Sequence, residues 1–232
     1  MRLLAWNIRA GGGSRLAPMM TAIAAEEADV LVLSEYHQGR AGQRLRAALA
    51  ESGYANATAS EPAPGRKGVL IAARTTLRDH GPIAPSLAEP WKLVAASIGR
   101  LWIVGVYMPN LLAKMPYWDA LLGHLAARHP HPTLAIGDFN TCRHFLDETG
   151  DTDRCAHFMD RVEAIGYHDL WRRRHPERRE YSWFSHRANG FRLDHAFFTP
   201  GLARRTGEIA YLHHFRAAGL SDHSAIRVDF ER

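Results

Sequence analysis

The chain has 232 residues, of which 46% are hydrophobic and 23% charged; its formal net charge is +5 and its sequence pI is about 9.5. This length is short for two domains and ample for one α/β domain, so we predict a single domain over residues 1–232. No apolar run approaches the roughly 20 residues of a membrane span, and the positive charge fits a polyanionic substrate or, equally, an arginine-rich solvated surface.

Hydrophobic periodicity predicts an alternation of strands and helices along the chain. In chain order we expect a strand at 2–5, a helix at 16–28, a strand at 30–33, a helix at 43–51, strands at 68–73, 93–98 and 102–107, a helix at 117–128, a strand at 133–136, a helix at 153–165, and strands at 181–185, 191–198, 208–211 and 225–230. Residues 61–65 and 81–90 read as loops. Hairpins mixed with helices favour an α/β sandwich over a parallel barrel.

Cys142 and Cys155 are the only cysteines, and they form neither a disulfide framework nor a zinc-like spacing. A reducing compartment is the default for such a chain. The apolar start at residues 1–6 is too short for a signal peptide. We therefore expect a cytoplasmic protein with no membrane insertion, and no obligate protein partner is evident.

Short polar clusters stand at or just after the ends of the apolar runs. They supply carboxylates, carboxamides, one phenol and one imidazole, and their members are Asn7, Glu35, Tyr107, Asn110, Asp138, Asn140, Asp194, Asp222 and His223. Because strand ends converge in a packed sheet, we expect these side chains to meet in one cleft. The set suits a hard cation and a phosphate ester, and it lacks the Ser/His or Cys/His pair of a covalent acyl enzyme.

Three of these residues are candidate ligands of a divalent cation. Glu35 follows a β-branched strand, where a carboxylate is available to Mg²⁺, although a surface glutamate at the start of a loop fits the same pattern. Asn7 offers a neutral oxygen or is a simple turn asparagine. Asp222 is left to face the metal if Asp194 is the partner of His223.

The catalytic candidates lie in two clusters. In the sequence 137–140, Asp138 is suited to orient and deprotonate a water and Asn140 to donate to a phosphate oxygen, with an Asx turn as the alternative. His223 is suited to donate to a phosphoryl oxygen as charge develops, and Asp194 to fix its tautomer and raise its pKa.

Other polar residues are candidates for contacting the substrate. Tyr107 offers a phenol near the leaving group, and Asn110 a carboxamide for a phosphate. Arg66 and Lys67 are suited to track a phosphate backbone. Arg192 is expected at the turn before Asp194, as a brace with substrate contact or as an exposed ion pair.

Taken in order, the clusters resemble the motifs of the endonuclease/exonuclease/phosphatase superfamily, and within it the exonuclease III and apurinic-endonuclease branch. Trp6-Asn7-Ile8 resembles the opening W-N-[IV], and Leu33-Ser34-Glu35 resembles L-Q-E. The later motifs Y-x-P-N, G-D-x-N, G-x-R-[IL]-D and S-D-H are resembled by residues 106–110, 137–140, 191–194 and 221–223. The resemblance runs nearly from end to end.

The resemblance implies a four-layer α/β/β/α sandwich with two mixed, mostly antiparallel sheets and a site at one rim. It implies Mg²⁺ as cofactor, with Mn²⁺ as a substitute, held by Asn7 and Glu35 with Asp222 contributing. It implies Asp138 as the water-activating residue beside Asn140, His223 on the phosphate with Asp194 as its partner, and Tyr107 in the active site. The implied reaction is hydrolysis of a phosphate ester by direct attack of water.

The chain also departs from that pattern. Arg9 stands where nucleic-acid repair members carry an acidic or amide residue; it either binds substrate phosphate or repels a second metal. The segments 110–117 and 185–190 are short where duplex binders are longer. We therefore predict a DNA nuclease, with a phosphatase or phosphodiesterase acting on a small or lipid-linked phosphate as the alternative, and a binding module with a degenerate site as the third hypothesis.

Overall fold

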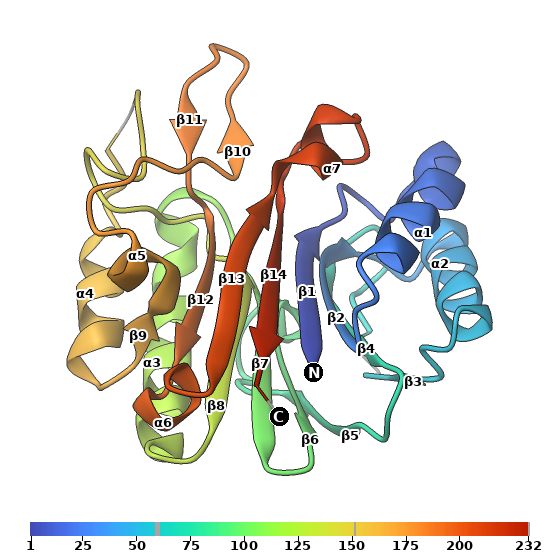
Figure 1. The fold of residues 1–232 in the computed structure, drawn as a ribbon, viewed down its shortest axis with the longest axis horizontal. Coiled ribbons are helices and arrows are strands. Elements are labelled where there is room, and N and C mark those ends of the chain that lie inside the picture. The colour runs from blue at the N-terminus through green and yellow to red at the C-terminus, as the bar shows by residue number, and fades with distance from the viewer. Residues whose placement is uncertain (59–60, 151, 232) are drawn as a thin grey trace.

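The computed structural model of the chain describes residues 1–58, 61–150 and 152–231, and two six-stranded sheets packed face to face form its centre (Figure 1). The first sheet contains, in spatial order, β13 (Thr206–Leu212), β14 (Ala225–Phe230), β1 (Arg2–Asn7), β2 (Val30–Tyr36), β4 (Gly68–Ala73) and β3 (Asn56–Ala57). The second contains β5 (Arg78–Pro82), β6 (Leu93–Ile98), β7 (Leu101–Tyr107), β8 (Thr133–Asp138), β12 (Asp194–Phe198) and β9 (His168–Asp169). A separate hairpin pairs β10 (Trp183–Phe184) with β11 (Gly190–Phe191).

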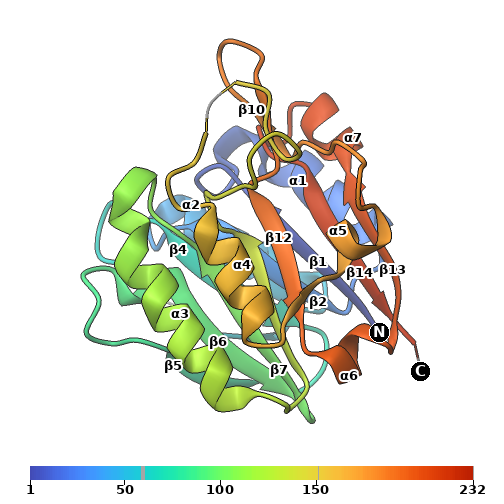
Figure 2. The ribbon, with the colours of Figure 1, turned by 90° about the vertical axis from the view of Figure 1, so that its left-hand side faces the viewer.

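Helices form the two outer layers (Figure 2). The helices α1 (Leu16–Ala25) and α2 (Arg40–Glu51) cover the first sheet, and α3 (Met115–Arg128) and α4 (His157–Ala164) cover the second. Shorter turns are α5 (Leu170–Arg174), α6 (Pro200–Ala203), α7 (His213–Ala217), and the 3-10 turns η1 (Gly13–Arg15), η2 (Pro90–Lys92) and η3 (Leu111–Lys114). The predicted four-layer α/β/β/α sandwich is confirmed.

Alternating side chains along the strands build the separate cores. In β2, Val30 and Val32 belong to the core between the sheets, whereas Leu31 and Leu33 pack in the core under α1 and α2. Because successive residues of a strand point to opposite faces and both faces are covered, the strand reads as a continuous apolar run. A third core lies between the second sheet and α3 and α4. No helix among the described residues is both long enough and apolar enough to span a bilayer.

Each sheet contains one parallel pair among otherwise antiparallel neighbours. The strand β1 runs parallel to β2, and β7 runs parallel to β8. Their carboxyl ends carry Asn7, Glu35, Tyr107 and Asp138, and the register places Tyr107 opposite Asp138. The β10–β11 hairpin and α7 lie at the upper end of the molecule in Figure 1, where β1 ends. The topology therefore delivers polar side chains from both sheets to one rim.

Several element boundaries differ from the expected ones. The region 81–90, expected as a loop, begins with the end of β5, a polar edge strand whose register shifts between Asp79 and Gly81. The strand expected at 191–198 is divided between β11 and β12. The helix expected from residue 153 begins at residue 157. β5 carries no apolar run because most of its residues are exposed or half-buried, and the Asp153 carboxylate accepts a hydrogen bond from the Cys155 backbone N–H in a turn that precedes α4.

At Gly105 in β7 the second sheet approaches the first sheet closely. A Cβ atom added there would lie 2.7 Å from Cγ1 of Val69 and 3.1 Å from Cγ1 of Val32, both in the first sheet. We expect Gly105→Val to lower the free energy of unfolding by about 1–3 kcal/mol because it overpacks this core. Urea denaturation at equilibrium measures the change.

Gly123 in α3 is the matched control. No heavy atom outside the local helix backbone lies within 4 Å of a Cβ added there, and its backbone is helical. Gly123→Ala should raise the free energy of unfolding by about 0.5–1 kcal/mol through the lower entropy of the unfolded chain. Equal stability of the two variants would contradict the close approach at Gly105.

Candidate active site

A cavity of about 1200 Å³ opens at the rim where the two parallel pairs end. Its polar lining includes Glu35, Tyr107, Asn110, Asp138, Asn140, Asp222 and His223, which were all predicted to meet in one cleft. Its apolar lining includes Leu111, Leu112, Trp183, Phe191 and Leu193. The sequence-distant strand ends therefore converge as expected, and they do so beside an apolar surface.

Glu35 reaches the cavity because the strand that carries it is locally distorted. Its φ is +63°, and the register between β2 and β4 shifts between Ser34 and Tyr36. A β-bulge of this kind re-aims a side chain at the end of a strand. The Glu35 carboxylate accepts a hydrogen bond from the Tyr107 hydroxyl at 3.3 Å and pairs with Nζ of Lys67 at 2.5 Å.

Asp138 is buried at the end of β8 and is held from two directions. Its Oδ2 accepts a hydrogen bond from Nδ2 of Asn7 at 2.9 Å, and its Oδ1 accepts one from the backbone N–H of Asn140 at 2.9 Å. The preceding Gly137 has φ +142°, and a Cβ there would lie 2.1 Å from the carbonyl oxygen of Val106. Only glycine fits this close approach, which brings Asp138 to the rim.

Asn140 is fixed in a left-handed conformation with φ +46°. Its Nδ2 donates to the carbonyl of Met108 at 2.7 Å, and its own carbonyl accepts a hydrogen bond from Nζ of the buried Lys114. Non-glycine residues with positive φ persist only where surrounding contacts determine them. These contacts hold the loop after β8 in one arrangement.

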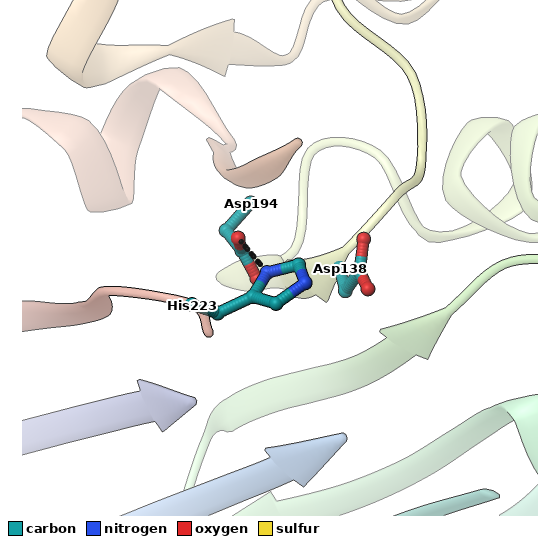
Figure 3. Close-up of side chains that lie close together, drawn as sticks. All are labelled: Asp138, Asp194 and His223. Carbon is teal, nitrogen blue, oxygen red and sulfur yellow. Dashed lines mark hydrogen bonds and ion pairs between the residues drawn. The ribbon is translucent and has the colours of Figure 1, made fainter. Parts of the chain in front are cut away.

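His223 and Asp194 form a buried pair. Nδ1 of His223 donates to Oδ2 of Asp194 at 2.7 Å, which leaves Nε2 free for a substrate. Figure 3 shows the imidazole of His223 between Asp194 and Asp138. One atom from each of these three residues, a carboxylate oxygen or an imidazole nitrogen that could bind a metal ion, lies within 4.8 Å of the other two. Trp6 secures the segment by donating from Nε1 to the carbonyl of His223 at 3.1 Å.

The pair shifts the acid–base properties of the site. Burial lowers the pKa of His223, but attraction to Asp194 and the hydrogen bond that His223 donates to it outweigh that effect and raise the pKa to about 9. Burial and repulsion by Asp194 raise the pKa of Asp138 to about 7, although His223 and the hydrogen bonds from Asn140 and Asn7 oppose the rise. Near neutral pH the site therefore holds an imidazolium beside a carboxyl group that readily gains or loses a proton.

The predicted metal ligands occupy different positions around this centre. Glu35 and Asp222 line the cavity, and Asn7 lies beneath it against Asp138. Asp222 accepts a hydrogen bond from Nε1 of Trp183 at 3.3 Å. Carboxylate and amide oxygens are the donors that Mg²⁺ prefers, so the donor chemistry of these residues fits a hard divalent cation.

The residues predicted to contact substrate divide into separate groups. Asn110 lines the cavity, and Lys67 lies at the site through its contact with Glu35. Arg9 and Arg66 are exposed, and neither is among the described residues that line the cavity.

The predicted substrate contact of Arg192 and the alternative of an exposed ion pair were both wrong. Its side chain is fully buried and donates hydrogen bonds to the carboxylate of Asp147 and to that of Asp169. The arginine therefore forms buried ion pairs and is not available to a substrate. Arg172 pairs with Asp147 in the same network, and Tyr211 lies 3.5 Å from Arg192. The arginine instead contributes to the support beneath Asp194, because the Tyr211 hydroxyl donates to the Asp194 carbonyl at 2.6 Å.

Two lysines near the site were not anticipated from the sequence. Lys114 holds the carbonyl of Asn140, and Lys92 places Nζ 3.9 Å from the ring centroid of Tyr107. Both side chains are buried. Lys114 is a lone lysine within the apolar segment 111–118, and this pattern could have revealed it. A buried ammonium needs partners, so such a lysine is expected to hold a specific contact.

Comparison with known proteins places the chain among phosphoesterases. The model of the Endonuclease/Exonuclease/phosphatase family matches residues 4–223. No curated protein gives a match.

Solved structures share the fold over the whole of both chains. An AP endonuclease from Archaeoglobus fulgidus superposes with a TM-score of 0.87 at 19% identity, and both chains are covered to 100%. The 3′-5′ exonuclease NExo from Neisseria meningitidis gives 0.86 at 22% identity, and the 3′ phosphatase NExo from Neisseria, bound to a product DNA hairpin, gives 0.84 at 21%, again with 100% of both chains covered. At these identities the similarity establishes the fold.

The His223–Asp194 pair predicts a measurable proton equilibrium. Because the pKa of folded His223 is raised from 6.5 to about 9, the pair stabilises the folded state fully below pH 6.5, and this stabilisation is lost as the pH rises through about 9. Asp194→Asn should lower the pKa of His223 and remove this pH-dependent part of the stability. NMR titration of the imidazole and urea denaturation at several pH values measure the two effects.

Asp119→Asn is the control, because Asp119 is an exposed carboxylate of α3 that pairs with Arg161. It should leave the titration of His223 unchanged. An unaltered His223 titration in Asp194→Asn would disprove the assigned pairing.

Proposed function

The chain belongs to the endonuclease/exonuclease/phosphatase family, and we propose that it is a Mg²⁺-dependent phosphodiester hydrolase that acts on DNA by direct attack of water. The observation that carries this proposal is the arrangement of Asp138, Asp194 and His223, in which a proton acceptor and a charged proton donor line one cavity with Glu35. A hydrolase that uses water as nucleophile needs a group that takes up the proton of the water and a donor that stabilises the charge on the phosphoryl oxygens.

Asp138 is the proton acceptor in this proposal. Its hydrogen bonds from Asn7 and from the Asn140 backbone fix the carboxylate, and its pKa of about 7 favours proton uptake from a bound water at neutral pH. The amide of Asn140 is engaged by Met108, so its part is to hold the loop that orients Asp138.

His223 stabilises the developing negative charge. Its Nδ1 is committed to Asp194, so Nε2–H of the imidazolium is the donor that a phosphoryl oxygen meets. Such a contact strengthens as charge builds on the transition state, which accelerates the chemical step rather than substrate binding. Tyr107 shares the cavity and orients Glu35 through its hydroxyl.

Glu35, with Asp222 and Asn7, is proposed to hold Mg²⁺, with Mn²⁺ as a substitute. When bound, the ion supplies a positive charge that polarises the phosphate and offsets the carboxylates of the site. Lys67 and Tyr107 keep the Glu35 carboxylate oriented toward the cavity.

DNA is the proposed substrate for three reasons. The net charge of +5 favours a polyanion, the apolar lining suits nucleosides, and one solved structure with this fold is bound to a product DNA hairpin. That neighbour is described as a 3′ phosphatase, which favours a phosphomonoesterase activity at DNA ends as the second candidate. We place the reaction in the cytoplasm, where the free, buried Cys142 and Cys155 stay reduced.

Removing either the proton acceptor Asp138 or the charge-stabilising His223 should abolish most turnover. Asp138→Asn and His223→Ala should each lower kcat by about 10²–10⁴-fold with little change in KM, because their contacts strengthen in the transition state. Steady-state cleavage of end-labelled DNA measures both constants. His186→Ala, which replaces an exposed histidine, should leave both unchanged; a fully active His223→Ala enzyme would refute the mechanism.

The metal requirement is tested by titration. Without divalent ions, or with EDTA, DNA should stay intact, and added Mg²⁺ or Mn²⁺ should restore cleavage. Glu35→Ala should raise the Mg²⁺ concentration needed for half-maximal activity by about tenfold or more, since it removes a carboxylate ligand. Glu51→Ala, an exposed glutamate at the end of α2, is the control. Cleavage that persists in EDTA would exclude a metal-dependent reaction.

A further inference from the structure

Two exposed leucines lie directly beside the catalytic residues. Leu111 and Leu112 begin the η3 turn immediately after Asn110, and both line the catalytic cavity. Leu111 is 82% exposed and Leu112 46% exposed, although both side chains are large and apolar. Leu111 also adopts φ +54°, a conformation that non-glycine residues rarely take. Exposure and strain at one leucine indicate a position that serves contact with a ligand rather than stability.

The turn that carries these leucines is anchored to the catalytic loop. Lys114, its last residue, is buried, donates to the carbonyl of Asn140 and pairs with Oδ2 of Asp153 at 2.8 Å. Asn140 in turn holds Asp138 through its backbone N–H. The leucines therefore stand at a fixed position relative to the proton acceptor, as a preorganised binding surface requires.

A second apolar surface belongs to the same cavity. Trp183 and Phe191, from the β10–β11 hairpin, have ring centroids 5.7 Å apart, and both line the cavity together with Leu193. The cavity volume of about 1200 Å³ exceeds the roughly 300–1,000 Å³ of a typical small-molecule site, so it accepts much more than one phosphate group. These apolar and aromatic side chains suit a ligand that presents an apolar or aromatic face beside the reacting phosphate.

We propose that Leu111 and Leu112 form a wall that packs against the base of a nucleoside next to the reacting phosphate, and that this wall makes the enzyme prefer unpaired DNA ends over intact duplex. The inference rests on the proposed function. A base inside a duplex presents its faces to a side chain only when it is unstacked from its neighbours, and unstacking is least costly for a base that is already single-stranded. A rigid apolar wall beside the acceptor therefore selects frayed or single-stranded ends.

The test compares three substrates: a single-stranded oligonucleotide, the blunt duplex of the same sequence capped by G·C pairs, and bis(4-nitrophenyl) phosphate, which carries no base. The wild type should show a higher kcat/KM on the single strand than on the duplex. The double variant Leu111→Ser/Leu112→Ser should lose about tenfold or more in kcat/KM on the single strand, mainly through KM. Its turnover of bis(4-nitrophenyl) phosphate should fall by a smaller factor than its turnover of the single strand, because a nitrophenyl ring offers a smaller face for packing than a base.

Phe145→Ser is the matched control. Phe145 is 74% exposed but is not among the described residues that line the cavity, so its loss should change none of the three activities. Leu111→Ala/Leu112→Ala keeps the surface apolar but shortens both side chains. Its kcat/KM on the single strand should lie between those of the wild type and the serine variant. Thermal unfolding confirms that each variant is folded.

The outcomes distinguish a failure of the contact between the leucines and a base from a failure of the proposed action on DNA. An unchanged preference for the single strand in the serine variant, or an equal loss on bis(4-nitrophenyl) phosphate, overturns the base-contacting wall while the nuclease assignment stands. A wild type that hydrolyses bis(4-nitrophenyl) phosphate but neither DNA substrate refutes the proposed action on DNA, and the base contact with it. A wild type that cleaves the duplex as efficiently as the single strand, or more so, also overturns the selection for unpaired ends while the nuclease assignment stands.

Discussion

Asn7 at the end of β1 and Asp138 at the end of β8 are joined by a hydrogen bond of 2.9 Å that crosses from one sheet to the other. A second hydrogen bond also joins the two sheets: the Ser34 hydroxyl donates to the carbonyl of Val106 at 3.1 Å. Because buried polar groups must be paired, these bonds hold the carboxyl ends of the two parallel pairs in register with each other. The site exists only where the sheets meet in this way, and Gly105 permits the close approach between them.

The buried charges beneath the site form a support that does not touch the cavity. Arg192 neutralises Asp147 and Asp169, and the Tyr211 hydroxyl fixes the Asp194 backbone from the same region. Removing one partner of such a network leaves an uncompensated buried charge, which typically costs about 3–5 kcal/mol. The position of Asp194, and so the charge on His223, therefore depends on residues that never meet a substrate.

The apolar strands and the order of polar clusters were predictable from the sequence, and the residues that depend on three-dimensional contact were not. The bounds 68–73, 93–98 and 225–230 coincide with β4, β6 and β14. β4 is buried along its whole length and leaves a continuous apolar run, whereas β14 alternates apolar residues with Arg227 and Asp229. The edge strand β5 lacks that signal. The burial of Arg192 and the pairing of Lys67 with Glu35 join segments more than 20 residues apart, so local pattern carries no trace of them.

Charge pairing around the cavity leaves the centre at Asp138 and Asp194 dependent on His223. Lys67 pairs with Glu35 and Lys114 pairs with Asp153, so these cations are already matched by carboxylates. Burial and repulsion by Asp194 raise the pKa of Asp138 to about 7, which shows that the remaining carboxylates are not fully compensated. An incoming phosphate adds a further negative charge at this point, and positive charge close to Asp138 would favour both its binding and the ionised carboxylate. In the proposed reaction, a cation held by Glu35, Asp222 and Asn7 would supply that charge.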